Sequence, residues 1–264
     1  MYSDKDHTFA ICAYKDSEYL EECINSLCSQ NIKTNIILCT STPSDFIYNL
    51  SQKYRIKIFV NKSTGRIADD WNFALKCAKT DIVTIAHQDD LYFPDYTKEI
   101  IRFINRAPKP LIAFSDYCEI RNGVTSGAER NLKIKRLMLY PLRAKKLWNS
   151  RFIRRRILSF GSAICCPSVT YVKPNIPENL FDNSYKVSLD WNAWERLSKL
   201  KGEFVFVNRI LMGHRIHENS ETTKNIVNSN RSKEDYLVFC KFWPKYIASI
   251  IGRIYKRSEI QNRL

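Results

Sequence analysis

The stretch DIVTIAHQDD, residues 81–90, decides the fold. Its first half is a compact apolar run, which is typical of a strand buried on both faces. An imidazole, His87, and two adjacent carboxylates, Asp89 and Asp90, follow directly. Carboxylate oxygens suit Mg²⁺ or Mn²⁺, and these ions in turn bind phosphate oxygens. The stretch therefore predicts either a metal-phosphate site at the end of a strand or a solvated turn before a helix that starts near Asp95.

Strands and helices alternate through the first half of the chain, which is typical of a mostly parallel sheet with helices on both faces. Ligands of such sheets bind at the carboxyl ends of the strands. No GxGxxG or GxxxxGK[ST] motif occurs, which excludes a standard dinucleotide fold and a P-loop enzyme. We expect strands at 7–13, 35–39, 57–60, 81–85, 111–117, 161–172 and 204–207, and a helix opening at Asp190.

The composition indicates an ordered enzyme-sized domain with an anionic partner. The 264 residues are 44% hydrophobic and carry a net charge of +15. Nine cysteines without CxxC spacing favour reduced thiols in a cytoplasmic protein. The polar first residues lack the pattern of a secretory signal, and no stretch is long enough to span a bilayer. We therefore expect a cytoplasmic location.

A basic segment, residues 131–158, interrupts the second half of the sequence. It has ten Lys and Arg side chains from Lys133 to Arg156 with no acid between them, interleaved with aromatic and aliphatic residues. A nucleic-acid site would need a recognisable module, and none is present, so no nucleic-acid partner is expected. The pattern suits an anionic membrane surface, with a solvated insertion as the alternative. Residues 224–264 repeat the basic and apolar chemistry, which predicts amphipathic C-terminal helices.

Five motifs, in this order, resemble family 2 glycosyltransferases with the GT-A fold. FAICAYKDSEYLEECI (9–24) is similar to that family's first strand, nucleotide loop and first helix. DDWNFAL (69–75) is similar to the helix before its acidic metal motif, and HQD (87–89) stands at that DxD motif. SLDW (188–191) is similar to the segment that carries the catalytic base, and HRIH (214–217) to the segment that closes over the diphosphate. The resemblance covers about residues 8–223, as a GT-A domain with a nucleotide-binding half (7–117) and an acceptor half (118–223).

The resemblance implies an inverting transfer of one sugar from a nucleotide-sugar donor to an acceptor hydroxyl, with Mn²⁺ or Mg²⁺. Asp190 would be the general base, although a helix N-cap is its alternative role. Asp89 and His214 would hold the metal, with His217 as the alternative histidine. The donor would be bound by Ala13, Tyr14, Thr40, Ser41, Arg66, Asp70, His87, Gln88 and Asp90.

The sequence departs from the family pattern at three points: His87 replaces an acid of the metal motif, Thr40-Ser41 an acidic pair, and Leu189 the acid before the base. Two alternatives therefore stay open, namely a nucleotidyltransferase and a degenerate transferase fold that only binds membrane or nucleic acid. The basic and aromatic patches favour a transferase acting on a lipid-diphosphate-linked saccharide at the inner membrane face, in surface polysaccharide assembly.

Overall fold

Strand β1 (His7–Ala13) lies inside a parallel four-stranded unit, in the order β3 (Lys57–Val60), β2 (Asn35–Thr40), β1, β4 (Ile82–His87). The computed structural model describes residues 1–63, 65–217 and 230–260. Phe9, Ala10 and Ile11 at the middle of β1 have no exposed surface. Burial on both faces explains why this strand is a continuous apolar run.

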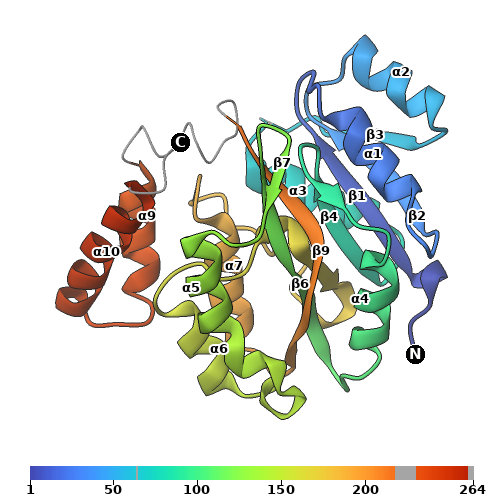
Figure 1. Ribbon diagram of the computed structural model, residues 1–264. Coiled ribbons are helices and arrows are strands. Elements are labelled where there is room, and N and C mark those ends of the chain that lie inside the picture. Colours follow the sequence, from blue (N-terminus) through green and yellow to red (C-terminus); the bar gives the residue numbers. More distant parts are fainter. Residues whose placement is uncertain (64, 218–229, 261–264) are drawn as a thin grey trace.

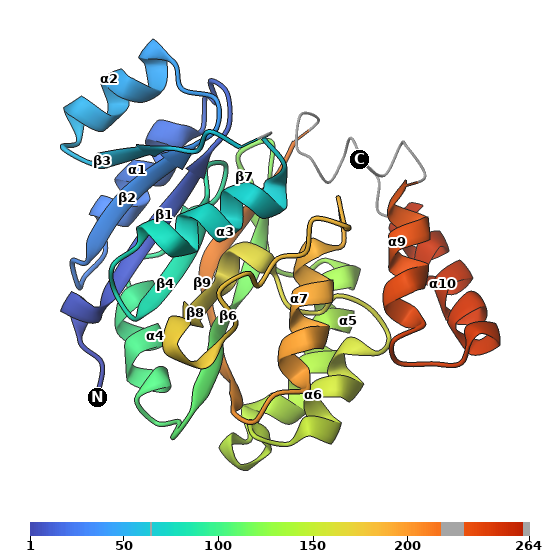
Figure 2. The same cartoon turned by 180° about the vertical axis from the view of Figure 1, so that it is seen from behind.

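Helices cover both faces of the sheet, as the alternation predicts. Helix α3 (Ile67–Cys77) lies on the face seen in Figure 2, while α1 (Leu20–Cys28) and α4 (Tyr96–Ile104) lie on the face seen in Figure 1. Helix α2 (Asp45–Lys53) connects β2 to β3 and begins at Ser44, whose hydroxyl accepts from the Ile47 amide. The predicted α/β class is therefore confirmed.

The second half adds antiparallel and parallel strands to the same sheet. Strand β8 (Val169–Val172) pairs antiparallel with β4 and with β6 (Pro110–Arg121). Strand β9 (Glu203–Ile216) runs parallel to β6 and antiparallel to the short β5 (Leu91–Tyr92). Strand β7 (Val124–Ser126) forms a hairpin with β6. The full order is β3-β2-β1-β4-β8-β6-β9-β5, so the sheet is mixed.

Several predicted strands have different bounds in the structure, and the largest differences are at β8 and β9. The apolar segment 161–172 becomes a strand only at β8, because a 3₁₀ turn at Cys166–Ser168 precedes it and Pro167 has no amide hydrogen for a ladder. The segment 204–207 is the start of the longer β9. His214 and Arg215 therefore lie within a strand, paired with Glu119 and Ile120 of β6, rather than in a loop after it.

The basic segment forms α5 (Arg130–Leu139), two 3₁₀ turns (Tyr140–Arg143, Lys145–Leu147) and α6 (Arg151–Leu158). Contact with a membrane surface would require exposed cations, and not all cations of this segment are exposed. Arg154 is fully buried, donates to the Leu200 carbonyl at 2.9 Å and lies over the ring of Phe204. Arg155 pairs with the buried Glu195 at 2.8 Å. These two arginines hold α6 to the rest of the domain.

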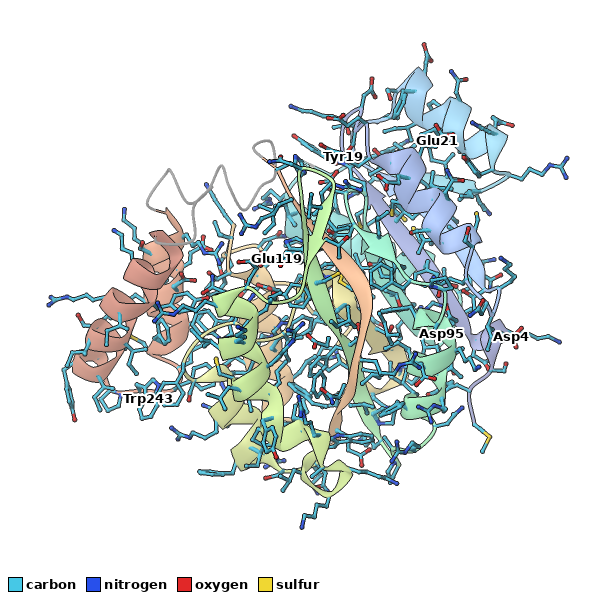
Figure 3. All side chains as sticks on the ribbon, in the orientation of Figure 1. Asp4, Tyr19, Glu21, Asp95, Glu119 and Trp243 are labelled. Atoms are coloured by element: carbon cyan, nitrogen blue, oxygen red, sulfur yellow. The ribbon has the colours of Figure 1, made fainter. Side chains whose placement is uncertain are left out.

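Helix α7 (Leu189–Ser198) begins close to the predicted Asp190 and packs against two C-terminal helices, α9 (Asn230–Phe239) and α10 (Lys245–Ile260). Trp191 of α7 contacts the rings of Phe239 at 4.8 Å and Tyr255 at 5.9 Å between centroids. Trp243, labelled in Figure 3, joins the pair to the domain by donating to the Ser159 carbonyl at 2.7 Å. The ends of the predicted tail, 224–229 and 261–264, lie outside the described residues.

Within the described ranges, none of the helices combines the length and apolar character that crossing a bilayer requires.

Candidate active site

A pocket of about 670 Å³ lies at the carboxyl ends of β1 and β4, with further walls from α3, α7, β9 and α9. It brings together residues from both halves of the predicted domain. Thr40, Ser41 and Arg66 are not among the described residues that line it. The predicted site residues that do line it are Ala13, Tyr14, Asp70, His87, Gln88, Asp89, Asp90, Asp190 and His214.

Asp89 follows β4 and has both carboxylate oxygens occupied by neighbours. Ser17 Oγ donates to Oδ1 at 2.8 Å, and His217 Nε2 lies 3.3 Å from Oδ2. Ser17 lies shortly before α1, which begins at Leu20, and its hydroxyl binds Asp89 rather than the helix. Of the two candidate histidines, His217 is the one beside Asp89. Among the described residues no group of three or more His, Cys, Asp or Glu side chains forms a metal cage.

Asp90 is almost fully buried below Asp89 and binds the end of β9. Its Oδ1 lies 2.9 Å from His214 Nδ1 and accepts from the Arg215 amide at 2.9 Å. Burial would raise the pKa of Asp90, but the charge and hydrogen bond of His214 outweigh it and leave that pKa below its ordinary value. The pKa of His214 is raised by Asp90 in spite of burial. The two side chains therefore form an ion pair that joins β4 to β9.

Arg215 is the residue of this region that sequence reasoning left without a role. It is 9% exposed, and its Nε donates to the Asp89 carbonyl at 2.9 Å. Its Nη2 donates to Glu22 at 2.6 Å, and its guanidinium lies 4.4 Å from the Tyr19 ring centroid. Figure 3 labels Tyr19 at this edge of the sheet. The quoted HRIH motif contained the signal, because strand alternation places Arg215 on the opposite face from His214 and on the same side as the next-but-one residue, His217. Both Arg215 and His217 contact the Tyr19 ring.

His87 and Gln88 shape the pocket floor in different ways. The His87 ring stacks on Trp71 of α3 at 5.2 Å, and burial lowers its pKa, so this imidazole is neutral at pH 7. Gln88 exchanges two hydrogen bonds with the Tyr14 backbone, at 2.9 and 3.0 Å. Gln88 therefore fixes the loop after β1 to the end of β4, where the resemblance implied a donor contact.

The polar residues at the end of β2 are bonded within the turn that follows or to Asp70. Thr40 is buried, and its hydroxyl accepts from the Thr42 amide at 3.0 Å. Ser41 Oγ donates to one Asp70 oxygen at 2.9 Å, and Asn61 Nδ2 donates to the other at 2.8 Å. Asp70, from α3, is thus the carboxylate that this side of the pocket presents. Arg66 is largely exposed and pairs with Asp69 at 3.3 Å.

Asp190 lies in the first turn of α7 and lines the same pocket as Asp89. The helix begins one residue earlier, so Asp190 is not its N-cap, and its Oδ1 accepts from the Trp191 amide at 2.7 Å. Burial raises the pKa of Asp190, against the opposing effects of the Trp191 amide and of two cations, Arg231 and Lys135. A carboxylate with a raised pKa in a pocket is suited to accept a proton.

Lys135 is a pocket residue that sequence reasoning assigned to the membrane-facing segment. It projects from α5 into the pocket and donates to the Tyr117 hydroxyl at 2.8 Å. Its neighbour Arg136 instead binds Asp116 at 2.7 Å, which ties α5 to β6. Nothing in the run of ten cations distinguishes Lys135 from the others, because the contact that places it is with a strand 18 residues earlier.

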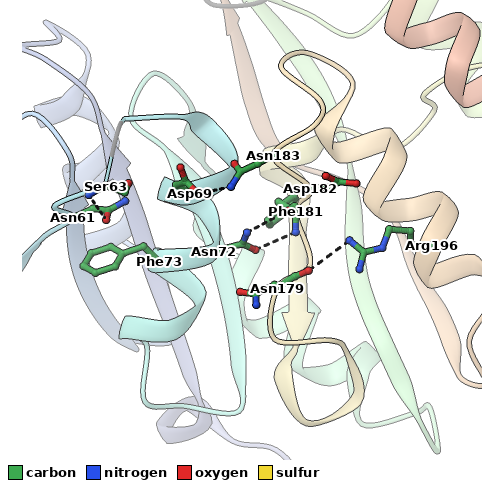
Figure 4. Close-up of a pocket in the computed structure, with 10 residues that line it drawn as sticks. All are labelled: Asn61, Ser63, Asp69, Asn72, Phe73, Asn179, Phe181, Asp182, Asn183 and Arg196. Atoms are coloured by element: carbon green, nitrogen blue, oxygen red, sulfur yellow. Dashed lines mark hydrogen bonds between the residues drawn. The ribbon is translucent and has the colours of Figure 1, made fainter.

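A second hollow, of about 810 Å³, lies between α3 and the chain that precedes α7 (Figure 4). Its polar groups are largely satisfied by each other. Asn72 exchanges two hydrogen bonds with the Phe181 backbone, Asn183 donates to Asp69 and Arg196 donates to the Leu180 carbonyl at 2.7 Å. These bonds fasten the loop that leads to Asp190 onto α3.

Comparison with known proteins agrees with this arrangement. Residues 8–173 match glycosyl transferase family 2. An uncharacterized glycosyltransferase of Rickettsia typhi is 25% identical over 221 residues, which are 83% of this chain and 66% of that protein. The chain thus spans just under two thirds of that relative's length.

Solved structures show the same fold at low sequence identity. The S. aureus TarS structure in complex with UDP-GlcNAc has a TM-score of 0.67 and 15% identity, covering 94% of this chain and 70% of that one. The Pyrobaculum calidifontis mannosyltransferase PcManGT, in complex with GDP-Man and Mn²⁺, has a TM-score of 0.61 and 13% identity, covering 95% and 69%. The family match extends over more than half of the chain, so the protein belongs to glycosyl transferase family 2, and its fold is the GT-A fold of these structures.

Proposed function

We propose that the protein is an inverting, metal-dependent glycosyltransferase that moves one sugar from a nucleotide-sugar donor to an acceptor hydroxyl. One observation carries the proposal. Asp89, at the end of the parallel strands, and Asp190, at the start of α7, line one pocket. The proposed metal and diphosphate ligand and the proposed general base therefore face the same cavity. The UDP-GlcNAc and GDP-Man complexes of fold relatives support this class of donor.

The donor side fits a divalent cation held by Asp89 with His217. Mg²⁺ and Mn²⁺ commonly use one or two protein ligands and complete their shell with substrate phosphates and water. An imidazole next to a carboxylate favours Mn²⁺ over Mg²⁺. When bound, such an ion would neutralise the departing diphosphate. Because His214 is paired with Asp90, we assign it to cationic support of the diphosphate rather than to the metal.

The acceptor side fits direct displacement with one base. Asp190 would remove the proton from the acceptor hydroxyl as that oxygen attacks the anomeric carbon, and the nucleoside diphosphate would leave from the other face. The attack inverts the anomeric centre, and no covalent sugar intermediate is required. Burial raises the pKa of Asp190, and the charges of Arg231 and Lys135 act against that rise and so favour the ionised form that a base needs.

We further propose that the acceptor is a lipid-diphosphate-linked saccharide reached from the cytoplasmic face of a membrane, as in surface polysaccharide assembly. Tyr246, Ile250 and Ile254 recur every four residues along α10 and are each more than half exposed. The opposite face of α10 packs inward through Ala248 and Tyr255. An apolar stripe on a chain of net charge +15 suits an anionic leaflet.

The test is turnover with a panel of nucleotide sugars and Mn²⁺, in the presence of acceptor lipid. We expect metal-dependent release of nucleoside diphosphate and a product whose anomeric configuration, read by NMR coupling constants, is opposite to that of the donor. Asp89→Ala and Asp190→Asn should each abolish release. Absence of release with every donor, or retention of configuration, would refute the proposal.

A further inference from the structure

We propose that helix α9 is part of the catalytic apparatus, with Glu234 as the residue that positions the loop leading to Asp190. The inference rests on the proposed role of Asp190 as the base. It gives the C-terminal helices a function in the reaction itself, separate from any contact with a membrane.

Glu234 binds three successive backbone amides just before α7. Its Oε1 accepts from the Lys186 amide at 2.9 Å, and its Oε2 accepts from Val187 at 2.8 Å and from Ser188 at 3.0 Å. Three converging amides form the kind of concavity that holds an anion. Because the chain runs directly from these amides through Leu189 to Asp190, fixing them fixes the approach to the first turn of α7.

Asp235, the next residue of α9, binds Ser188, the residue directly before α7. Ser188 is the N-cap position of α7, but its side chain makes no capping bond to the helix. Its hydroxyl donates instead to Asp235 Oδ1 at 2.7 Å, and Asp235 is 5% exposed. A serine that normally stabilises its own helix is thus bonded to α9. The start of α7 therefore depends on both Glu234 and Asp235, 46 or more residues away in sequence.

Helix α9 also contributes charge to the base. Arg231, one turn before Asp235, lies 3.8 Å from its Oδ2 and lines the pocket with Asp190. The cations that lower the pKa of Asp190 are Arg231 from α9 and Lys135 from α5; the other titratable groups that interact with it are Cys165, Cys166 and Tyr171. Helix α9 thus both holds the chain before Asp190 in place and favours the ionised form of Asp190.

The first test is Glu234→Gln, with the exposed Lys233→Ala on the same helix as a matched control. An amide offers one acceptor oxygen and turns an NH₂ group toward the remaining donors, so the amides of 186–188 should exchange hydrogen faster in hydrogen-exchange mass spectrometry. The value of kcat should fall by about 10- to 100-fold because the base is misplaced. The KM for the donor and the Mn²⁺ requirement should be unchanged, since Asp89 lies on the β4 side. Lys233→Ala should match the wild type.

The second test keeps the inference falsifiable if Glu234→Gln folds poorly. Arg231→Met should move the acid limb of the kcat–pH profile to higher pH, a shift that a purely structural role for α9 would not produce. Unchanged amide exchange and kcat in Glu234→Gln, or an unmoved acid limb in Arg231→Met, would overturn the inference. Wild-type turnover in Asp190→Asn would instead refute the proposed base, while leaving the exchange result interpretable.

Discussion

Arg215 offers the sharpest prediction about what holds the site together. Replacing it with Met keeps the length of the side chain but removes its bond to the Asp89 carbonyl, its pair with Glu22 and its contact with the Tyr19 ring. A hydrogen bond from a charged donor contributes about 1.5–3 kcal/mol, and the cation–π contact about 0.5–2 kcal/mol. Because Glu22 is half exposed, its pair contributes at most about 1 kcal/mol.

Together these losses predict that Arg215→Met lowers the free energy of unfolding by about 3 kcal/mol. For a chain of this length that corresponds to a fall in Tm of about 6 °C. The Tm of Arg215→Lys should lie between those of the wild type and Arg215→Met. A single ammonium group cannot bind both the Asp89 carbonyl and Glu22 as the forked guanidinium does. Differential scanning calorimetry measures the shift, with Lys53→Met as the control for an exposed ion pair. A fall of less than about 1 °C in Arg215→Met would refute the assigned contacts.

Three further predictions concern Asp190 and α10. Burial raises the pKa of Asp190, so activity should be full above that pKa and fall as pH decreases through it. Lys135→Met removes a cation that lowers this pKa, so the acid limb of the kcat–pH profile should move to higher pH. The ionised form costs folding energy for the same reason, so Asp190→Asn should raise Tm at pH 7 while abolishing turnover, and a lower Tm would contradict the burial argument. Replacing Tyr246, Ile250 and Ile254 together with Ser should weaken flotation with anionic vesicles at low salt without changing Tm; undiminished flotation would exclude the α10 stripe as the membrane contact.

The fold could be predicted from the sequence because its main signals are local. The apolar runs of β1 and β4 are short, continuous and followed directly by polar residues, and this pattern places the strand ends without tertiary information. Residues 161–168, before β8, resisted prediction because they are largely buried and apolar without forming a strand, and an apolar run alone does not distinguish a strand from other buried chain.

Site residues could be predicted from the sequence only where they directly follow a strand or stand at the start of a helix. Asp89, Asp190 and Tyr14 follow or begin elements, so their place at the pocket follows from topology. The contacts of Lys135, Arg215 and the α9 carboxylates join segments far apart in the chain, and such pairings leave no local pattern. The donor contact that the resemblance implies for Thr40 stays a prediction; Thr40 ends β2, and its hydroxyl accepts from the Thr42 amide within the turn.

The most direct test of the account is calorimetric binding of nucleoside diphosphates, with and without Mn²⁺, to the wild type and to Asp89→Ala. We propose that the pocket at the carboxyl ends of β1 and β4 is a metal–diphosphate site built on Asp89. Mn²⁺ should therefore tighten the binding of at least one nucleoside diphosphate by tenfold or more in the wild type and have no effect in Asp89→Ala. Equal Mn²⁺-dependent binding by both proteins, or no binding of any nucleoside diphosphate by the wild type, would contradict it.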